Sequence, residues 1–280
     1  MVVYSLKTFI LVVSIVEYSL YDGKSGFVEG VSVEEDLTLT YKEKMALDKF
    51  KEQMLPHLPH EYMKQDIYLI RWLRARNLNQ KQAEEMLLEN LKWRKERNMD
   101  TINEEDWSDM KDDYHYDADT FDREGRPIGT LNIGPWNFRR AAITGKMPRL
   151  IRYMDKLLEE ATQAVITQQG MGKNVTQWKV ILNLDGFSII QHACPLCLPG
   201  YATFVSSYEN HYPQYADALI LLNTPPAFQV VLELVRPIFT HHTRQALKIY
   251  GQDKRQWEAA LDKEISKEER RPEFGGVKSD

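Results

Sequence analysis

The stretch from His211 to Gly251, HYPQYADALILLNTPPAFQVVLELVRPIFTHHTRQALKIYG, decides the fold of this chain. A short apolar run, Ala218 to Leu222, predicts a strand that ends at Asn223 and a Pro-Pro pair. Pro226 to Val235 predicts a helix, and Ala246 to Tyr250 predicts the next strand. Strands that alternate with helices are typical of a parallel sheet with right-handed crossovers.

The helix inside this stretch is apolar on nearly every side. From Ala227 to Val235, only Gln229 and Glu233 are polar. A helix that is apolar all round is buried, or it faces something other than water. A segment of about nine residues is far too short to cross a bilayer. Two interpretations stay open: a core helix, or one wall of a cavity that holds a lipid-like ligand.

The flanking sequence continues the alternation of strands and helices. Tyr114 to Ala118 and Ile128 to Ile133 predict two strands joined by a turn from Asp122 to Pro127. The further expected elements are a helix over Pro148 to Gln168, a strand over Trp178 to Leu184, a helix over Cys197 to Tyr212 and a final helix over Gln256 to Ile265. We therefore expect an α/β fold, in which an N-terminal all-helical module precedes a mostly parallel sheet flanked by helices.

The N-terminal part shows helical periodicity from Leu39 onward. Asp66 is expected to cap one helix, and Leu78-Asn79 to open another. The acidic stretch that follows the module is expected to be a hinge. The expected divisions are an apolar leader and linker (1–36), a helical module (37–100), the hinge (101–113), the sheet domain (114–276) and a tail (277–280).

The leader is strongly apolar from Val2 to Leu20, but Lys7 and Glu17 interrupt it. A membrane-spanning helix needs about twenty mostly apolar residues with few charges. A signal peptide needs a basic start and a small-residue cleavage site, and here only Lys7 precedes the apolar run, with no Ala-x-Ala-like site after it. We expect a poorly ordered or peripherally membrane-associated leader, with a signal peptide or an anchor as the alternative.

Composition limits the classes of function. Hydrophobic content of 43% and charged content of 28% are ordinary for a soluble globular protein. The net charge of −5 argues against a nucleic-acid binder, which would show a basic domain or stripe. Two cysteines cannot form a disulfide framework, so a reducing, cytosolic setting is favoured.

Motifs for nucleotide, redox and metal chemistry are incomplete. Gly170 to Asn174 imitates the end of a phosphate-binding loop, but Asn174 stands where that loop has a hydroxyl residue. Cys194-Pro195-Leu196-Cys197 has no second pair of zinc ligands, so two half-buried thiols are expected, with redox or metal binding as the lesser alternative. The histidine pairs lack carboxylates at suitable spacing: His57 and His60, and His241 and His242. We expect no metal, no cofactor and no enzymatic activity.

A series of ordered motifs resembles the CRAL-TRIO family. LIRWLRARN at Leu69 to Asn77, with Trp93-Arg94-Lys95 beyond it, is similar to that family's N-terminal helical module. Asp122-x-x-Gly125-Arg126-Pro127 resembles its opening hairpin. The later motifs keep the family's order: Tyr212-Pro213, Asn223-x-Pro225, Arg236-Pro237-Ile238, Lys248-Ile249 and Glu273-Phe274-Gly275-Gly276.

The resemblance extends over residues 39–276 and is strongest to animal members related to the secretory phosphatidylinositol-transfer protein, including tocopherol-associated ones. Several of those continue into a β-sandwich GOLD domain, which we expect to be lacking here. The resemblance implies a hydrophobic pocket floored by the sheet and closed by a mobile gate helix, Pro226 to Arg236, with a hinge at Pro237-Ile238-Phe239. The implied ligand contacts are Phe228, Val231, Leu232, Val235, Phe239, Lys248, Gln214, Tyr153, Leu182 and Leu221.

One departure from the family concerns the ligand. In phosphoinositide-binding relatives a Glu follows the Tyr-Pro pair and contacts the Lys of Lys-Ile, whereas Gln214 takes that place here and Lys248 is kept. The resemblance thus implies a phospholipid, tocopherol, retinoid or sterol ligand, and a cytoplasmic monomer that visits membrane surfaces transiently. The alternative is a regulatory or protein-interaction module whose pocket is vestigial.

Overall fold

A five-stranded sheet organises the structure, a computed structural model that describes residues 32–279. The strands are β1 (Asp117–Phe121), β2 (Pro127–Asn132), β3 (Trp178–Asn183), β4 (Ala216–Leu222) and β5 (Leu247–Ile249), and they lie in that order. β1 and β2 form an antiparallel hairpin, and β2 to β5 are parallel. The expected α/β fold with a mostly parallel sheet is confirmed.

β1 begins later than the Tyr114 start that we expected. The amide of Tyr114 donates to the carbonyl of Met110, 2.9 Å away, and the carbonyl of His115 accepts from the Trp136 indole at 3.0 Å. Because these backbone groups already form other hydrogen bonds, they cannot pair with β2. Pairing therefore starts at Asp117.

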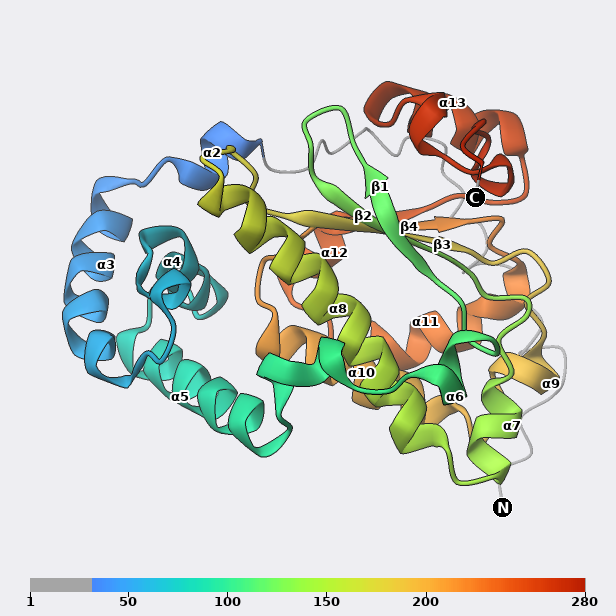
Figure 1. Cartoon of the computed structure of the whole chain (residues 1–280), viewed down its shortest axis with the longest axis horizontal. Coiled ribbons are helices and arrows are strands. Elements are labelled where there is room, and N and C mark those ends of the chain that lie inside the picture. The colour runs from blue at the N-terminus through green and yellow to red at the C-terminus, as the bar shows by residue number, and fades with distance from the viewer. Residues whose placement is uncertain (1–31, 280) are drawn as a thin grey trace, which may run out of the picture. The chain divides into compact units, whose positions relative to one another are not determined.

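Side chains alternate between the two faces of the sheet, so each strand contributes to two cores. On β3, Trp178 belongs to a large apolar cluster and Leu182 packs against it, whereas Ile181 belongs to a smaller cluster on the other face. The large cluster is covered by α8 (Met147–Gly170), α10 (Leu198–His211), η4 (Pro226–Phe228) and α11 (Gln229–Val235). The small cluster is covered by α13 (Lys254–Glu264) and η6 (Pro272–Phe274). Figure 1 shows α13 on one side of the sheet and α8, α10 and α11 on the other.

The N-terminal helices form a module with its own core, which includes Leu47, Phe50 and Trp72. Its elements are α2 (Val33–Leu37), α3 (Tyr41–Met54), η1 (Leu55–His57), η2 (Glu61–Lys64), α4 (Asp66–Ala75) and α5 (Gln80–Glu96). Thr40 and Glu43 form a capping box, and Asn79 caps α5 as expected.

Two expectations for this region are corrected. Asp66 is not a cap but the first residue of α4, where its carboxylate pairs with the Lys51 ammonium at 2.5 Å. The end of the expected linker forms the helix α2. Asp36 of this helix is buried and pairs with Arg74 of α4. The predicted leader lies outside the described residues.

The segment that we expected to be a hinge is packed against α8. It contains η3 (Met99–Glu104) and α6 (Ser108–Lys111), and it places Ile102, Trp107 and Met110 in the large cluster. Its acidic residues have partners as well: Glu105 accepts from Arg149 at 3.1 Å, and the Arg149 guanidinium lies 3.8 Å from the Trp107 ring centre. Residues 32–279 accordingly belong to one compact unit.

Four short helices complete the described elements: α7 (Phe138–Ile143), α9 (Ile189–His192), α12 (His241–Ala246) and η5 (Lys267–Glu269). Within residues 32–279, no helix has both the length and the apolar character needed to cross a bilayer.

Candidate functional site

The large apolar cluster brings together most of the residues expected to contact a ligand. Tyr153 of α8, Leu221 of β4 and three residues of the expected gate, Phe228, Val231 and Leu232, all belong to it. Leu182 of β3 packs against the cluster while remaining partly exposed. The cluster is therefore bounded by the sheet, by α8, and by η4 with α11.

α11 covers this cluster and is apolar on both of its sides. Val231, Leu232 and Val235 point inward and are buried. On the outer side, Val230 is 38% and Leu234 is 36% exposed. Neither η4 nor α11 has a side-chain cap, so packing rather than capping holds this short segment in place.

The residues that follow α11 are held by a contact between the start of α12 and α10. Val235 and Phe239 are buried but lie outside the large cluster. The Thr240 amide, which follows Phe239, donates to the Glu209 carboxylate at 3.0 Å. Burial raises the pKa of Glu209, although hydrogen bonds from Thr243 and Thr240 oppose this effect.

Lys248 and Gln214 are not brought together. Lys248 shares the face of the sheet covered by α13, where its ammonium lies 3.1 Å from the Glu264 carboxylate. Gln214 has a positive φ of 58°, and its carbonyl accepts from Arg71 at 2.7 Å and from Gln177 at 3.1 Å. In the described structure the expected headgroup lysine thus faces away from the apolar cluster and has a different acidic partner.

A buried charge network at Lys179 was missed in the sequence. The Lys179 ammonium lies 2.9 Å from Asp122, 3.3 Å from Asp217 and 2.5 Å from Glu264. Burial lowers the pKa of Lys179, but the carboxylates of Glu264, Asp217 and Asp122 outweigh it, so the pKa is raised. The sequence feature that could have predicted this network is a charged residue inside an otherwise apolar strand, because a buried charge needs a partner.

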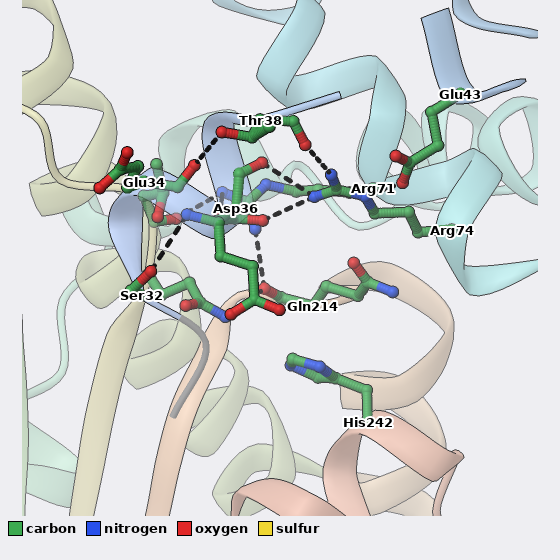
Figure 2. Close-up of polar contacts among 12 residues, drawn as sticks. Ser32, Glu34, Asp36, Thr38, Glu43, Arg71, Arg74, Gln214 and His242 are labelled. Atoms are coloured by element: carbon green, nitrogen blue, oxygen red, sulfur yellow. Dashed lines mark hydrogen bonds and ion pairs between the residues drawn. The ribbon is translucent and has the colours of Figure 1, made fainter. Parts of the chain in front are cut away.

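Arg71 of α4 ties the helical module to the edge of the sheet domain. Its guanidinium donates to the carbonyls of Gln214 and Thr176 and lies 4.2 Å from the centre of the Tyr215 ring. Asp36 of α2 accepts from the neighbouring Arg74 at 2.8 Å and lies 3.7 Å from Arg71. Figure 2 shows Asp36, Arg71 and Gln214 converging at this joint.

A second joint is buried between α5 and α8. The Arg94 guanidinium donates to both oxygens of Glu159, at 2.9 and 2.8 Å, and also to Asp100. Tyr212 donates to the same Glu159 carboxylate at 3.0 Å. Glu159 is 2% exposed, so this pair is shielded from water.

Cys194 and Cys197 form a disulfide, which corrects the expectation of two half-buried thiols. They are 6% and 0% exposed, and their Cα atoms are 4.9 Å apart, within the range that a bridge spans. A turn in which the Cys197 amide donates to the Cys194 carbonyl brings them together. The bridge closes the connection between α9 and α10.

Two surface hollows lie away from the expected ligand residues. One, of about 430 Å³, is lined by residues that include Met63, Leu91 and Arg94, and another, of about 320 Å³, lies between α5 and α10. Neither is lined by a residue of α11. Among residues 32–279, no group of three histidine, cysteine or acidic side chains could hold a metal ion.

Comparisons with known proteins agree with this architecture. The family model for the CRAL/TRIO domain matches residues 113–276. "Protein real-time" of Drosophila pseudoobscura pseudoobscura is 27% identical over 211 residues, which are 74% of this chain and 31% of that protein. The chain therefore spans about a third of the length of this relative.

A solved structure supports the fold independently. The crystal structure of Sfh5 superposes with a TM-score of 0.64 over 79% of this chain and 84% of that one. At 16% identity, this likeness concerns the fold alone.

Proposed function

Because the chain belongs to the CRAL/TRIO family, we propose that it binds a hydrophobic ligand or a phospholipid between the sheet and α11 and exchanges it with membranes. The observation that carries this proposal is the apolar cluster on one sheet face, covered by a short helix that is apolar on both sides. Lipid binding and transfer is the general activity of the family. In this proposal the protein is a cytoplasmic, non-enzymatic carrier that meets membranes peripherally.

The energetics of α11 support its role as a gate. Moving α11 away from the sheet in water exposes Val231 and Leu232, at about 1.5–3 kcal/mol for each side chain. At a bilayer surface, both the inner and the outer apolar residues can contact acyl chains, so this cost falls. A ligand gains about 0.8 kcal/mol for each CH₂ group that it buries, which offsets the displaced contacts. Opening is therefore favoured at the membrane and disfavoured away from it.

The lining favours a ligand that is apolar over most of its surface. The cluster beneath α11 is built from aliphatic and aromatic side chains, and Lys248 with Glu264 lies on the other face of the sheet. A tocopherol, retinoid or sterol fits such a lining without requiring an ionic partner. A phospholipid fits if its headgroup stays at the rim of the site.

A transfer assay with one gate variant tests the proposal. Phe228 is 5% exposed, and the centre of its ring lies 5.2 Å from that of Phe187. The Phe228→Asp substitution therefore places a charge where the proposed gate meets the cluster. We expect transfer of labelled lipid between vesicles to fall to background, while circular dichroism and thermal unfolding show that the fold survives. Wild-type transfer in a folded Phe228→Asp protein would remove α11 from the mechanism.

A second candidate function is a regulatory or protein-interaction module with a vestigial pocket. It is favoured by the burial of five expected ligand residues that pack together in the large cluster: Tyr153, Leu221, Phe228, Val231 and Leu232. It predicts no lipid in the purified protein and no transfer by the wild type. The two functions therefore separate in the same assay.

A further inference from the structure

Four large apolar side chains are exposed on one part of the sheet domain. Ile143 of α7 is 63% exposed, Ile189 and Ile190 of α9 are 51% and 70% exposed, and Leu196 in the turn after α9 is 65% exposed. α7 and α9 pack against each other, with the Phe138 and His192 rings 6.4 Å apart on their inner sides. We call this surface the α7–α9 face. Single exposed apolar residues are ordinary, but a group of them marks an interaction site.

The α7–α9 face is held rigidly. The Gln191 amide donates to the carbonyls of Gly134 at 3.1 Å and Trp136 at 2.9 Å, which fastens α9 to the loop after β2. The Cys194–Cys197 bridge closes the turn that presents Leu196. The exposed side chains are therefore kept outward by a fixed backbone, and the face needs no rearrangement before it meets a partner.

Basic residues lie on the α7 side of this face. Arg139, Arg140 and Lys146 are exposed on and just after α7. Arg140 pairs with Asp113 at 3.5 Å, but Arg139 and Lys146 have no ion-pair partner among the residues that the structure describes. The exposed acidic residue next to α9 is Asp185. The face thus combines unpaired cations with apolar side chains on a chain whose net charge is −5.

This combination fits an anionic bilayer surface. Apolar side chains enter the boundary between headgroups and acyl chains, and each nearby Lys or Arg adds attraction to acidic lipids. The face also adjoins the gate, because Phe187, just before α9, touches Phe228 at the start of the α11 segment. A membrane that binds here therefore lies beside the part of the protein that has to open.

We propose that the α7–α9 face docks the protein onto anionic membranes and so delivers α11 to the bilayer. The inference rests on the proposed lipid exchange and assigns it a contact surface and a class of lipid. Ile189 and Ile190 enter the interface, and Arg139 and Lys146 meet the acidic headgroups.

Vesicle binding by the full chain tests this surface. We compare phosphatidylcholine vesicles with vesicles that also contain phosphatidylserine. Ile189→Asp with Ile190→Asp should weaken binding by about tenfold or more, since two side chains lose their apolar contact. Met45→Asp is the matched control, because Met45 on α3 is 55% exposed and lies outside the face. It should bind as the wild type does.

A charge-reversal pair tests the electrostatic part. Arg139→Glu with Lys146→Glu should weaken binding to the phosphatidylserine vesicles by more than about tenfold, and added salt should then weaken it little further. Native mass spectrometry of each variant reports whether lipid is still bound inside. Variants that bind vesicles like the wild type overturn the docking surface, and retained internal lipid would leave the proposed carrier function standing. Loss of vesicle binding with internal lipid kept supports the docking surface.

Discussion

At the scale of single residues, the sheet domain holds several ionisable groups in positions shielded from water. Most have opposite charges as partners, as Lys179 and Glu159 do. Asp155 of α8 differs, because it accepts a hydrogen bond from the neutral Ser207 hydroxyl, 2.8 Å away. Burial raises the pKa of Asp155 to about 6, although Ser207 and the more distant Arg97 and Arg152 oppose this rise.

Asp155 therefore reduces stability at neutral pH. A carboxyl whose folded pKa exceeds its unfolded value stabilises the protein below the unfolded pKa and loses that contribution as pH rises through the folded pKa. Asp155→Asn keeps a hydrogen-bonding amide beside Ser207 and removes the ionisation. We expect the free energy of unfolding at pH 7.5 to rise by about 1–3 kcal/mol relative to the wild type, and the gain to vanish near pH 4.

Urea denaturation of both proteins across this pH range measures the difference. Asp112→Asn, at an exposed position on the same domain, is the control and should change stability little. A gain for Asp155→Asn that is independent of pH would contradict the assignment of the effect to ionisation.

At the scale of elements, α11 is apolar on both its buried and its exposed side. Its inner residue Leu232 is 5% exposed and belongs to the large cluster, while its outer residue Leu234 is 36% exposed. In the proposed gate, the inner side stabilises the closed position of α11. The outer side is proposed to contact the membrane.

Alanine substitutions on the two sides should have different consequences. Leu232→Ala removes core contacts, so the free energy of unfolding should fall by about 2–4 kcal/mol. Leu234→Ala should cost well under about 1 kcal/mol but slow lipid transfer, because less apolar surface enters the bilayer. Thermal unfolding and the vesicle transfer assay, run on both variants, separate the effects. Equal loss of stability in the two variants would mean that α11 is an ordinary core helix.

The longer elements could be predicted because each carries a strong periodic signal. β3 and β4 are apolar runs, and α8 has an apolar stripe that begins after a proline. The short helices α7, α9 and α12 were missed, since four to six residues give too few turns to show a period. The acidic composition of segment 101–113 predicts a hinge, whereas its spaced apolar residues Ile102, Trp107 and Met110 pack in the large cluster.

At the scale of the molecule, two buried arginines connect the helical module to the sheet domain. Arg71 contacts backbone carbonyls just before β3 and β4, and Arg94 pairs with Glu159 of α8. A buried ion pair that loses one partner leaves an uncompensated charge, which costs far more than a surface pair does. These joints make the module part of the same cooperative unit as the sheet domain.

Arg94→Met tests that coupling. It leaves Glu159 buried without its cation, so we expect the free energy of unfolding to fall by about 3–5 kcal/mol. Lys92→Met, on the same helix with a side chain 73% exposed, should stay within about 0.5 kcal/mol of the wild type. Calorimetry of the wild type should show a single unfolding transition for the described residues. Two separate transitions would show that the module unfolds independently.

The contacts at the candidate site that the sequence could not predict join residues of different elements. The shared packing of Tyr153, Leu182, Leu221 and the α11 residues follows from the apolar pattern and the family's motif order, and their contact with a ligand stays a prediction. The contact of Lys248 with Glu264 depends on which face of β5 the lysine takes, and the Arg71 contact with Gln214 joins residues far apart in the chain. The disulfide depends on a local turn before α10. The Lys248 and Arg71 contacts arise from tertiary packing and leave no local signal, whereas the Cys-x-x-Cys spacing is visible in the sequence but does not settle whether the thiols are bridged.

The most direct test of lipid carriage is native mass spectrometry of this 280-residue chain, followed by extraction and identification of any bound lipid. The carrier function predicts one hydrophobic ligand in each molecule of the wild type. It also predicts a lower occupancy in a folded Leu182→Trp variant, whose larger side chain would fill space next to the large cluster. A wild-type protein that carries no lipid, even after incubation with vesicles, would contradict the carrier function.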